Sequence, residues 1–452
     1  MRKNDLGRAP VLPLVLRLAI PTMLAQFVNV LYSIVDRMFI GHIPEIGNDA
    51  LAGVGVCGPI IAVLYAFCYL IGQGGTPLMA MALGANEQRQ AAAVMANCFR
   101  LLIGLGIGLT VIFLLIRKQL LWWFGASSAT YPYADRFLTI YLCGTLFALL
   151  SGGMNSFLIA QGRSGLGVGT VLTGTLLNIL LDPILIFKLQ LGVEGAALAT
   201  VISQAVSTVF ALSCLRHMKL TVQLRWGRFD PTLCKKIMML GLAPFLTYAL
   251  DSGLLIVLNA TLQRTGGPDE GDLLISCATI IQSYMLLITS PLSGITMGSQ
   301  GIVSFNLGAK HYQRVKSALW SVYFVCLGFC SVMFLVSFFA TPYFVHLFTA
   351  DATLVRHAVP YIRLYAAGVL CMAAQWTVTD MGIAMEQMRM ALICSLIRKG
   401  LYLVGVLVLP ILFYPAAAFA AQPICDVVAS VISIGAFFRV IPPLLQQKRV
   451  GV

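Results

Sequence analysis

Three polar groups around Asp182 could together hold a small cation. Asp182 is the only charged residue between Val168 and Phe187, and Asn178 stands four positions earlier. In a helix these two side chains share one face. Pro183 follows directly, and a proline within a helix removes the hydrogen bond to the carbonyl four residues earlier, which leaves a third oxygen available. A carboxylate, an amide and a carbonyl predict a site for H⁺ or Na⁺.

Other polar side chains interrupt long apolar runs. Asp36 lies within the segment Tyr32–Gly41, and Asp251 follows Pro244 by seven residues. An ionisable group at membrane depth costs at least about 2–3 kcal/mol and usually has a function. A carboxylate facing a cavity would attract lipophilic cations. We therefore predict an ion site that includes Asp36 and Asp182, and substrate contacts at four positions, Asp251, Gln282, Gln375 and Asp380.

The elements that position these residues are predicted to be membrane-spanning helices. Of 452 residues, 59% are hydrophobic and 10% are charged, and the mean hydropathy is +0.89. A soluble domain has about 45–50% apolar and about 25% charged residues. Continuous apolar runs favour helices over the alternating strands of a barrel. We predict an all-α integral membrane protein with twelve spans, at 13–40, 52–72, 92–116, 134–160, 167–188, 193–215, 237–262, 272–297, 317–341, 357–384, 396–413 and 417–441.

The basic excess follows from membrane topology. The net charge is +13, which in a soluble chain would suggest nucleic acid. Here the basic residues of the loops gather on one side of the predicted spans, above all in the segment from Arg216 to Lys236. By the positive-inside rule that side is cytoplasmic. We predict a multi-pass protein of the cell (inner) membrane, surrounded by lipid, with both termini cytoplasmic and with no nucleic-acid or obligate protein partner.

Cysteine and histidine give no sign of enzyme chemistry. The twelve cysteines lie mostly inside apolar runs without a CxxC pair, and the five histidines are scattered. Metal and nucleophile sites need such ligands in clusters. We expect no enzyme activity, no cofactor, and no metal apart from Na⁺ at the ion site.

An internal repeat divides the chain into two halves. Leu83-Gly84-Ala85 recurs 224 residues later as Leu307-Gly308-Ala309, and Tyr141 and Gly144 recur at the same offset as Tyr365 and Gly368. Because each half has six spans, both enter the membrane in the same direction, so we predict two pseudo-symmetric six-helix lobes in a parallel repeat. The lobes are 1–215 and 237–452, joined by a basic cytoplasmic linker at 216–236. When the halves are aligned on Pro183 and Pro410, Asp182 falls on Leu409, so the first lobe is expected to do the coupling.

These residues resemble a known family. Tyr32–Gly41, Asn178–Pro183, the Leu-Gly-Ala turns and Ser304–Ala309 are similar to the multidrug and toxic compound extrusion (MATE) family, in its bacterial DinF/MepA-like branch. The similarity covers nearly the whole chain. It implies a cation-coupling pocket formed by Asp36, Asn178, Asp182 and Thr200. It also implies that the first helix bends at Pro21, and Pro183 is a second expected hinge.

The resemblance implies a secondary active multidrug exporter, which exchanges amphipathic, cationic small molecules for H⁺ or Na⁺. Burial and repulsion between Asp36 and Asp182 would favour one shared proton. Two alternatives stay open. A lipid-linked oligosaccharide flippase of the same superfamily should line its cavity with arginines that hold pyrophosphate, and arginine within the spans is scarce. An intramembrane enzyme would need a constellation of reactive groups that the sequence does not supply.

Overall fold

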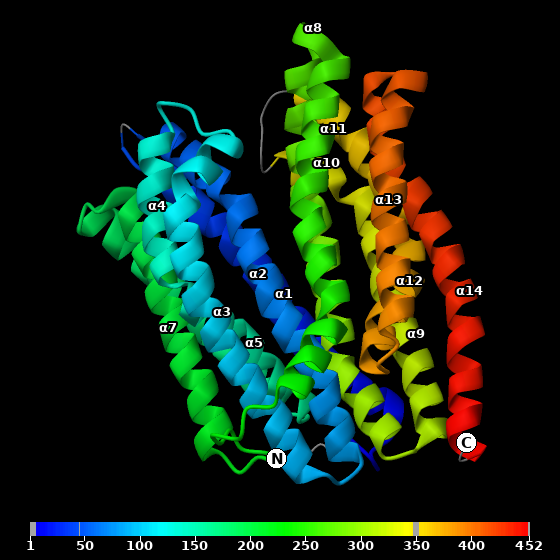
Figure 1. Ribbon diagram of the computed structural model, residues 1–452. Helices are drawn as coiled ribbons and strands as arrows, with labels where there is room; N and C mark the ends of the chain where they lie inside the picture. The colour runs from blue at the N-terminus through cyan, green and yellow to red at the C-terminus, as the bar shows by residue number, and fades with distance from the viewer. Residues whose placement is uncertain (1–5, 45, 347–351, 451–452) are drawn as a thin grey trace.

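The computed structural model describes residues 6–44, 46–346 and 352–450, and this part of the chain is built from helices. Figure 1 shows two bundles that converge at the end where both termini lie and diverge toward the other end. The first bundle contains α1 (Val11–Gly41), α2 (Gly47–Gly84), α3 (Gln88–Trp123), α4 (Tyr131–Cys143), α5 (Thr145–Ala160), α6 (Ser164–Pro183), η1 (Ile184–Lys188) and α7 (Gly192–His217). The second contains α8 (Pro231–Gly308), α9 (Tyr312–Phe339), α10 (Thr341–His346), α11 (Ala352–Tyr365), η2 (Ala366–Gly368), α12 (Val369–Ala384), α13 (Met388–Leu412), η3 (Pro415–Ala420) and α14 (Ala421–Val450).

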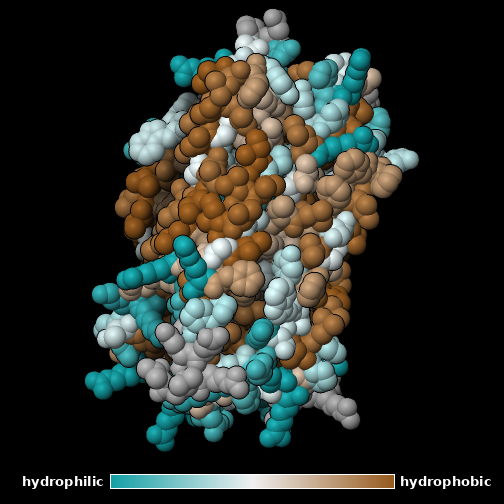
Figure 2. Space-filling view, turned by 90° about the vertical axis from the view of Figure 1, so that its right-hand side faces the viewer, coloured by the Kyte–Doolittle hydropathy of each residue, from teal (hydrophilic) through white to brown (hydrophobic). Residues whose placement is uncertain are grey.

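The predicted number of spans is confirmed for the described residues. Eleven helices are long and apolar enough to cross a membrane, and the bent pair α4 and α5, at 54° to each other, makes twelve. The long α8 contributes two spans, because Gly267 has φ 64° and ψ −161° and breaks the helix between 231–267 and 273–308. Several predicted boundaries differ. The second and eighth spans end at Gly84 and Gly308, well past the expected 72 and 297, and α13 begins at Met388, eight residues before the expected 396. Figure 2 shows a surface of the kind expected for a membrane-spanning bundle, with a broad hydrophobic middle and hydrophilic side chains toward the ends.

The backbone repeats the offset of 224 residues seen in the sequence. Gly144 separates α4 from α5, and Gly368 ends the short η2 between α11 and α12. Residues with positive φ recur as well: Asn86 (62°) with Lys310 (58°), and Gly162 (72°) with Glu386 (60°). Left-handed conformations are uncommon outside glycine, so these matched turns are strong evidence that the halves share one fold.

The two bundles meet through glycines on α2 and α8. A Cβ atom at Gly84 would lie 1.8 Å from the carbonyl oxygen of Phe305, and one at Gly308 would lie 2.0 Å from that of Met81. Because Gly84 and Gly308 are equivalent in the repeat, this reciprocal contact lies on the pseudo-twofold axis. Only glycine allows backbones to approach so closely. The lobes are therefore packed tightly at the end that carries the termini.

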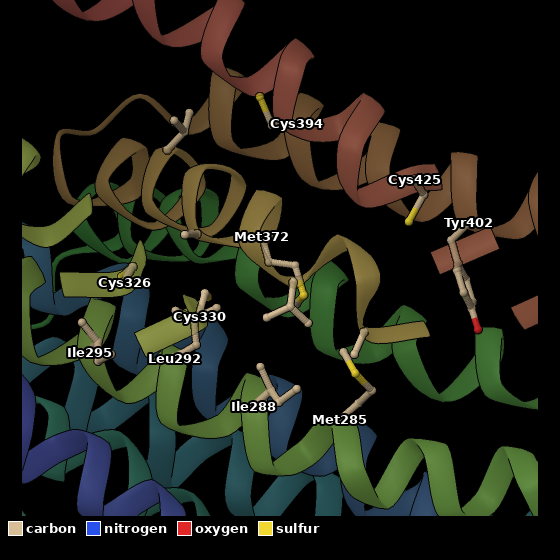
Figure 3. Packing of buried hydrophobic residues seen from close by; sticks show 14 of the residues in the cluster. Met285, Ile288, Leu292, Ile295, Cys326, Cys330, Met372, Cys394, Tyr402 and Cys425 are labelled. Carbon is tan, nitrogen blue, oxygen red and sulfur yellow. The ribbon is translucent and has the colours of Figure 1, made fainter. Parts of the chain in front are cut away.

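Each bundle has its own apolar core. In the second bundle, Met285, Ile288, Leu292 and Ile295 follow one face of α8 at helical spacing and are buried. Figure 3 shows them lying along α8, with Cys326, Cys330 and Met372 from neighbouring helices close by. The cores also interlock. The second core includes Leu14, Val15, Leu18 and Ala19 of α1, and the first includes Ile237, Leu240 and Ala243 of α8.

Candidate functional site

A polar pocket lies in the first bundle, between α1, α6 and α7. Asp182 of α6 is fully buried, Asp36 of α1 is half-buried, and the two carboxyl groups are close enough to interact. One oxygen of Asp36, Oδ1, is buried without a hydrogen-bond partner. Two carboxyls this close in a place shielded from water favour an added cation between them.

Asn178, Tyr32 and Thr200 complete this pocket. With the Asn178 amide oriented to satisfy both of its ends, its nitrogen donates to Asp182 Oδ2 (3.2 Å) and to Tyr32 Oη (3.0 Å), and its oxygen accepts from the Thr200 backbone N–H (3.1 Å). The Thr200 hydroxyl donates to the Ala196 carbonyl at 3.0 Å. The structure thus brings together all four residues expected for cation coupling. Sequence reasoning assigned no role to Tyr32, although Tyr32 and Asp36 are one helical turn apart.

The local sequence explains how the end of α6 lies against α7. Pro183 ends α6 and is followed by the π-helical turn η1, as expected where proline interrupts the regular hydrogen bonds. A Cβ at Gly195 of α7 would lie 2.7 Å from the carbonyl oxygen of Leu185, so only glycine lets η1 pack this closely on α7. Pro183 therefore marks a break in the helix beside the pocket.

Pro21 lies inside α1, which is one helix from Val11 to Gly41. Next to it, the hydroxyl of Thr22 lies 2.7 Å from the carbonyl oxygen of Gly294 on α8. A Cβ at Gly298 would lie 2.3 Å from that hydroxyl. The chain thus packs the proline segment of α1 against two glycines of the other bundle.

A separate cavity of about 470 Å³ lies between the two bundles. The four residues predicted as substrate contacts all line it: Asp251, Gln282, Gln375 and Asp380. The first bundle contributes Gln26, Asn29, Tyr69 and Gln73. None of the four coupling residues is among the lining residues, so the polar pocket and the cavity are two places.

Hydrogen bonds fix most of the polar groups in the cavity wall. Gln282 donates to Tyr365 Oη at 3.3 Å, and Thr296 donates to Asp380 Oδ2 at 2.5 Å. Gln375 donates to the hydroxyl of Thr379 at 3.2 Å. The rings of Tyr69 and Tyr248, one from each bundle, stack with their centroids 4.0 Å apart. The wall therefore combines oriented polar groups with flat aromatic surface.

Charged residues that sequence reasoning missed lie in the second bundle. Arg398 and Lys399 of α13 line the cavity, and the fully buried Asp426 of α14 lies behind them. Arg398 Nη2 lies 3.0 Å from Asp426 Oδ1, and the Lys399 ammonium donates to Asp251 Oδ1. The signal for Asp426 was available, because it is the only charged residue between Tyr414 and Phe438, as Asp182 is in its own run.

Three interpretations change with this finding. Asp251 faces the cavity as a substrate contact should, but it is paired with Lys399 and is 54% exposed, so its charge is compensated and its attraction for a lipophilic cation is weaker than expected. Arg398 lies within a span and lines the cavity, against the expectation that arginine is scarce there. The second half lacks a counterpart of the Asp182 pocket, yet it carries an ionic cluster of its own at other positions. Arg398 and Lys399 escaped notice because the start of α13 was placed eight residues too late, which put a basic pair near the membrane surface.

Comparison with known proteins agrees with this architecture. The MatE family model matches residues 21–184 and 245–411, one segment in each half. The multidrug export protein MepA of Staphylococcus aureus (strain N315) is 26% identical over 91% of this chain and 89% of its own length. A MATE crystal structure in the straight conformation has a TM-score of 0.90 at 21% identity, with 99% of each chain covered. An outward-facing multidrug resistance MATE transporter of the MOP superfamily has a TM-score of 0.88 at 20% identity, again covering 99% of each chain.

These matches, the two-bundle fold and the paired sites define a membrane transporter. The chain belongs to the MatE family of multidrug efflux transporters, and it is not an enzyme.

Proposed function

We propose that this transporter is a secondary active exporter that exchanges amphipathic, cationic compounds for protons across the cell (inner) membrane. The observation that supports this most directly is the separation of two sites. A carboxylate pair with an added amide lies inside the first bundle, while a cavity large enough for a small molecule lies between the bundles. Binding of an ion at one place and of a substrate at the other is what an exchange mechanism requires.

The donors around the carboxylates favour H⁺ over Na⁺ as the coupling ion. The Asn178 oxygen accepts from the Thr200 N–H, and its nitrogen faces Asp182 and Tyr32. An amide that presents N–H groups to the carboxylate offers no ligand to a sodium ion, which prefers several oxygens. A proton needs only the two carboxyls, which can share it between Asp36 and Asp182.

The charges of the cavity support a cationic substrate. Arg398 is neutralised by Asp426, and Lys399 by Asp251. Asp380 accepts a hydrogen bond from Thr296, but no basic side chain of the described residues pairs with it. The cavity therefore has one carboxylate in excess, and the low dielectric of the interior strengthens its attraction for a lipophilic cation.

The exchange follows from the position of α1. Its start packs in the core of the second bundle, Gln26 and Asn29 line the cavity, and Asp36 lies in the polar pocket. Proton uptake at Asp36 removes repulsion from Asp182 and lets α1 move toward α6. Bending at Pro21 would then move the cavity wall and release the substrate. With both termini cytoplasmic, the membrane potential assists inward proton movement by about 2.3 kcal/mol per charge per 100 mV.

Arg398 does not favour the flippase alternative. Its guanidinium is engaged by Asp426, and a single occupied arginine gives no cluster for a pyrophosphate.

Flux measurements test this function directly. The protein is reconstituted in liposomes with a cationic dye, rhodamine B ethyl ester, and pH and Na⁺ gradients are imposed separately. We expect dye transport against its gradient under a pH gradient, and no transport above that of empty liposomes under a Na⁺ gradient. Transport driven by Na⁺ alone would contradict the choice of ion, and transport driven by neither gradient would contradict the exchange mechanism.

A further inference from the structure

Two adjacent basic residues in the cavity wall are paired in different ways. Arg398 and Lys399 both line the cavity, with side chains that are only 12% and 9% exposed. A cation this buried is costly unless a carboxylate accompanies it. The partners are Asp426 for Arg398 and Asp251 for Lys399, and these two carboxylates differ in burial and in the number of groups that hold them.

Asp426 is fixed in the protein interior. Its side chain is fully buried, and it does not line the cavity. Gln422 donates to both of its oxygens, at 3.1 and 3.0 Å, and Arg398 donates to Oδ1 at 3.0 Å. Arg398 therefore has a permanent partner that no ligand in the cavity can replace without leaving a buried charge behind.

Asp251 is held by one contact and faces the cavity. Its side chain is 54% exposed, and among the described residues Lys399 is its one ion-pair and hydrogen-bond partner. Because Asp251 keeps much of its hydration, it loses little when it leaves the pair. Lys399 is buried and cannot follow it into water, so it needs another anion whenever Asp251 departs.

We propose that Lys399 is an anion subsite of the cavity, which Asp251 occupies in the absence of substrate and the carboxylate of a zwitterionic amphipathic substrate occupies during transport. This inference rests on the proposed function and extends its substrate class from cations to zwitterions, which carry a carboxylate besides the cationic group. The exchange keeps Lys399 paired at every stage. The cationic end of the same ligand lies toward Asp380 or toward the displaced Asp251, and its apolar body packs on the stacked rings of Tyr69 and Tyr248.

A matched pair of dyes tests the subsite. Rhodamine B has a free carboxylate and is zwitterionic, whereas its ethyl ester has the same ring system and is a cation. Fluorescence polarisation with the full-length protein in detergent gives a Kd for each dye. The readout is the acid preference, defined as the Kd of the ester divided by the Kd of rhodamine B.

Substitutions of Lys399 and of Asp251 should change the acid preference in opposite directions. Lys399→Met should lower the acid preference about tenfold, because a charge-assisted hydrogen bond to the carboxylate is lost. Asp251→Asn should raise it about threefold or more, because the competing carboxylate is gone and Lys399 is free. Proportional weakening of both dyes by Lys399→Met, or an acid preference that stays equal or falls in Asp251→Asn, would overturn the proposal.

A double-mutant cycle separates local competition from a general change of charge. Lys399→Met should lower the acid preference by a larger factor in the Asp251→Asn background than in the wild type, because no internal carboxylate remains to be displaced. The matched background is Asp380→Asn, which removes one negative charge from the same cavity without touching Lys399. In the Asp380→Asn background Lys399→Met should lower the acid preference by the same factor as in the wild type. If the factor were the same in the Asp251→Asn and Asp380→Asn backgrounds, displacement of Asp251 would be contradicted.

Two further measurements keep the outcome decisive. Should Lys399→Met fail to fold, Lys399→Arg retains the charge and should retain the acid preference, while Asp251→Asn alone tests the direction of the shift. Gradient-driven transport of the ester reports on the proposed function. If the wild type transports the ester but the variants show no shift in acid preference, the subsite alone is contradicted. If the wild type does not transport the ester under a pH gradient, the proposed exporter function is contradicted.

Discussion

Asp182 and Asp36 form the carboxylate pair of the polar pocket, and they differ in burial. Asp182 is fully buried and held by Asn178, whereas Asp36 is half-buried and keeps one oxygen without a partner. Asp182→Asn or Asp36→Asn removes one carboxylate of the pair while preserving its shape. Gradient-driven dye export should fall at least about tenfold, because the remaining carboxylate no longer shares a proton with a second one. Transport assays in liposomes measure the export rate, and a melting curve in detergent shows whether the variant keeps the wild-type fold.

A matched control for these substitutions is Asp135→Asn. Asp135 pairs with Arg117 at 2.9 Å, and its side chain is 26% exposed. This acid lies outside both polar sites, so its replacement should leave export within twofold of the wild type, as expected for a partly exposed ion pair. Full export by both pocket variants would remove the pair from the coupling mechanism.

How far single residues could be predicted depends on their context in the chain. A lone charge in an apolar run identifies Asp182, and polar side chains within runs identify Gln282 and Asp380, which the structure places in the cavity wall. Pairing between distant helices is invisible to such reasoning. The partner of Asp251 is Lys399, 148 residues away, and that contact depends on how α8 and α13 pack.

At the scale of elements, α1 is the one helix of the described part of the chain that reaches both polar sites and the second core. Pro21 lies between its core-packed start and the cavity residues Gln26 and Asn29. Pro21→Ala restores a backbone N–H and stiffens the helix. We expect an equal or higher melting temperature together with export at least about fivefold slower, because bending becomes more costly.

Pro59→Ala is the control for this change. Pro59 also lies inside a long helix, α2, but it lines neither polar site. Its replacement should leave export close to the wild type. If Pro21→Ala also exported at the wild-type rate, bending at this proline would not be part of the cycle.

The elements themselves were well predicted, because each span is a continuous apolar run with polar residues at its ends. The errors lie at boundaries. The predicted start of α13 at 396 leaves Arg389 outside the span, since basic residues usually mark the end of a span. In the structure the helix begins at Met388, and the carboxylates Asp251 and Asp426 compensate the charges inside it.

At the scale of the whole molecule, the two bundles diverge away from the termini and are packed together near them (Figure 1). The closed end depends on glycines, with Gly84 against Phe305 and Gly308 against Met81. The repeat was visible in the sequence through the Leu-Gly-Ala turns. That these turns contact each other across the pseudo-twofold axis was not, because an offset in sequence specifies equivalence and not proximity.

Gly84→Ala should therefore open this end of the transporter. Its Cβ would lie 1.8 Å from a backbone oxygen, so the helices must separate, at a cost of roughly 1–3 kcal/mol. Spin labels at the exposed, repeat-equivalent Arg89→Cys and Gln313→Cys, with Cys143 and Cys371 replaced by serine, report the distance between the lobes. We expect a shift toward longer distances. Gly104→Ala, which meets nothing within 4 Å, is the control and should leave the distribution unchanged. An unchanged distribution in Gly84→Ala would show that this contact does not hold the end closed.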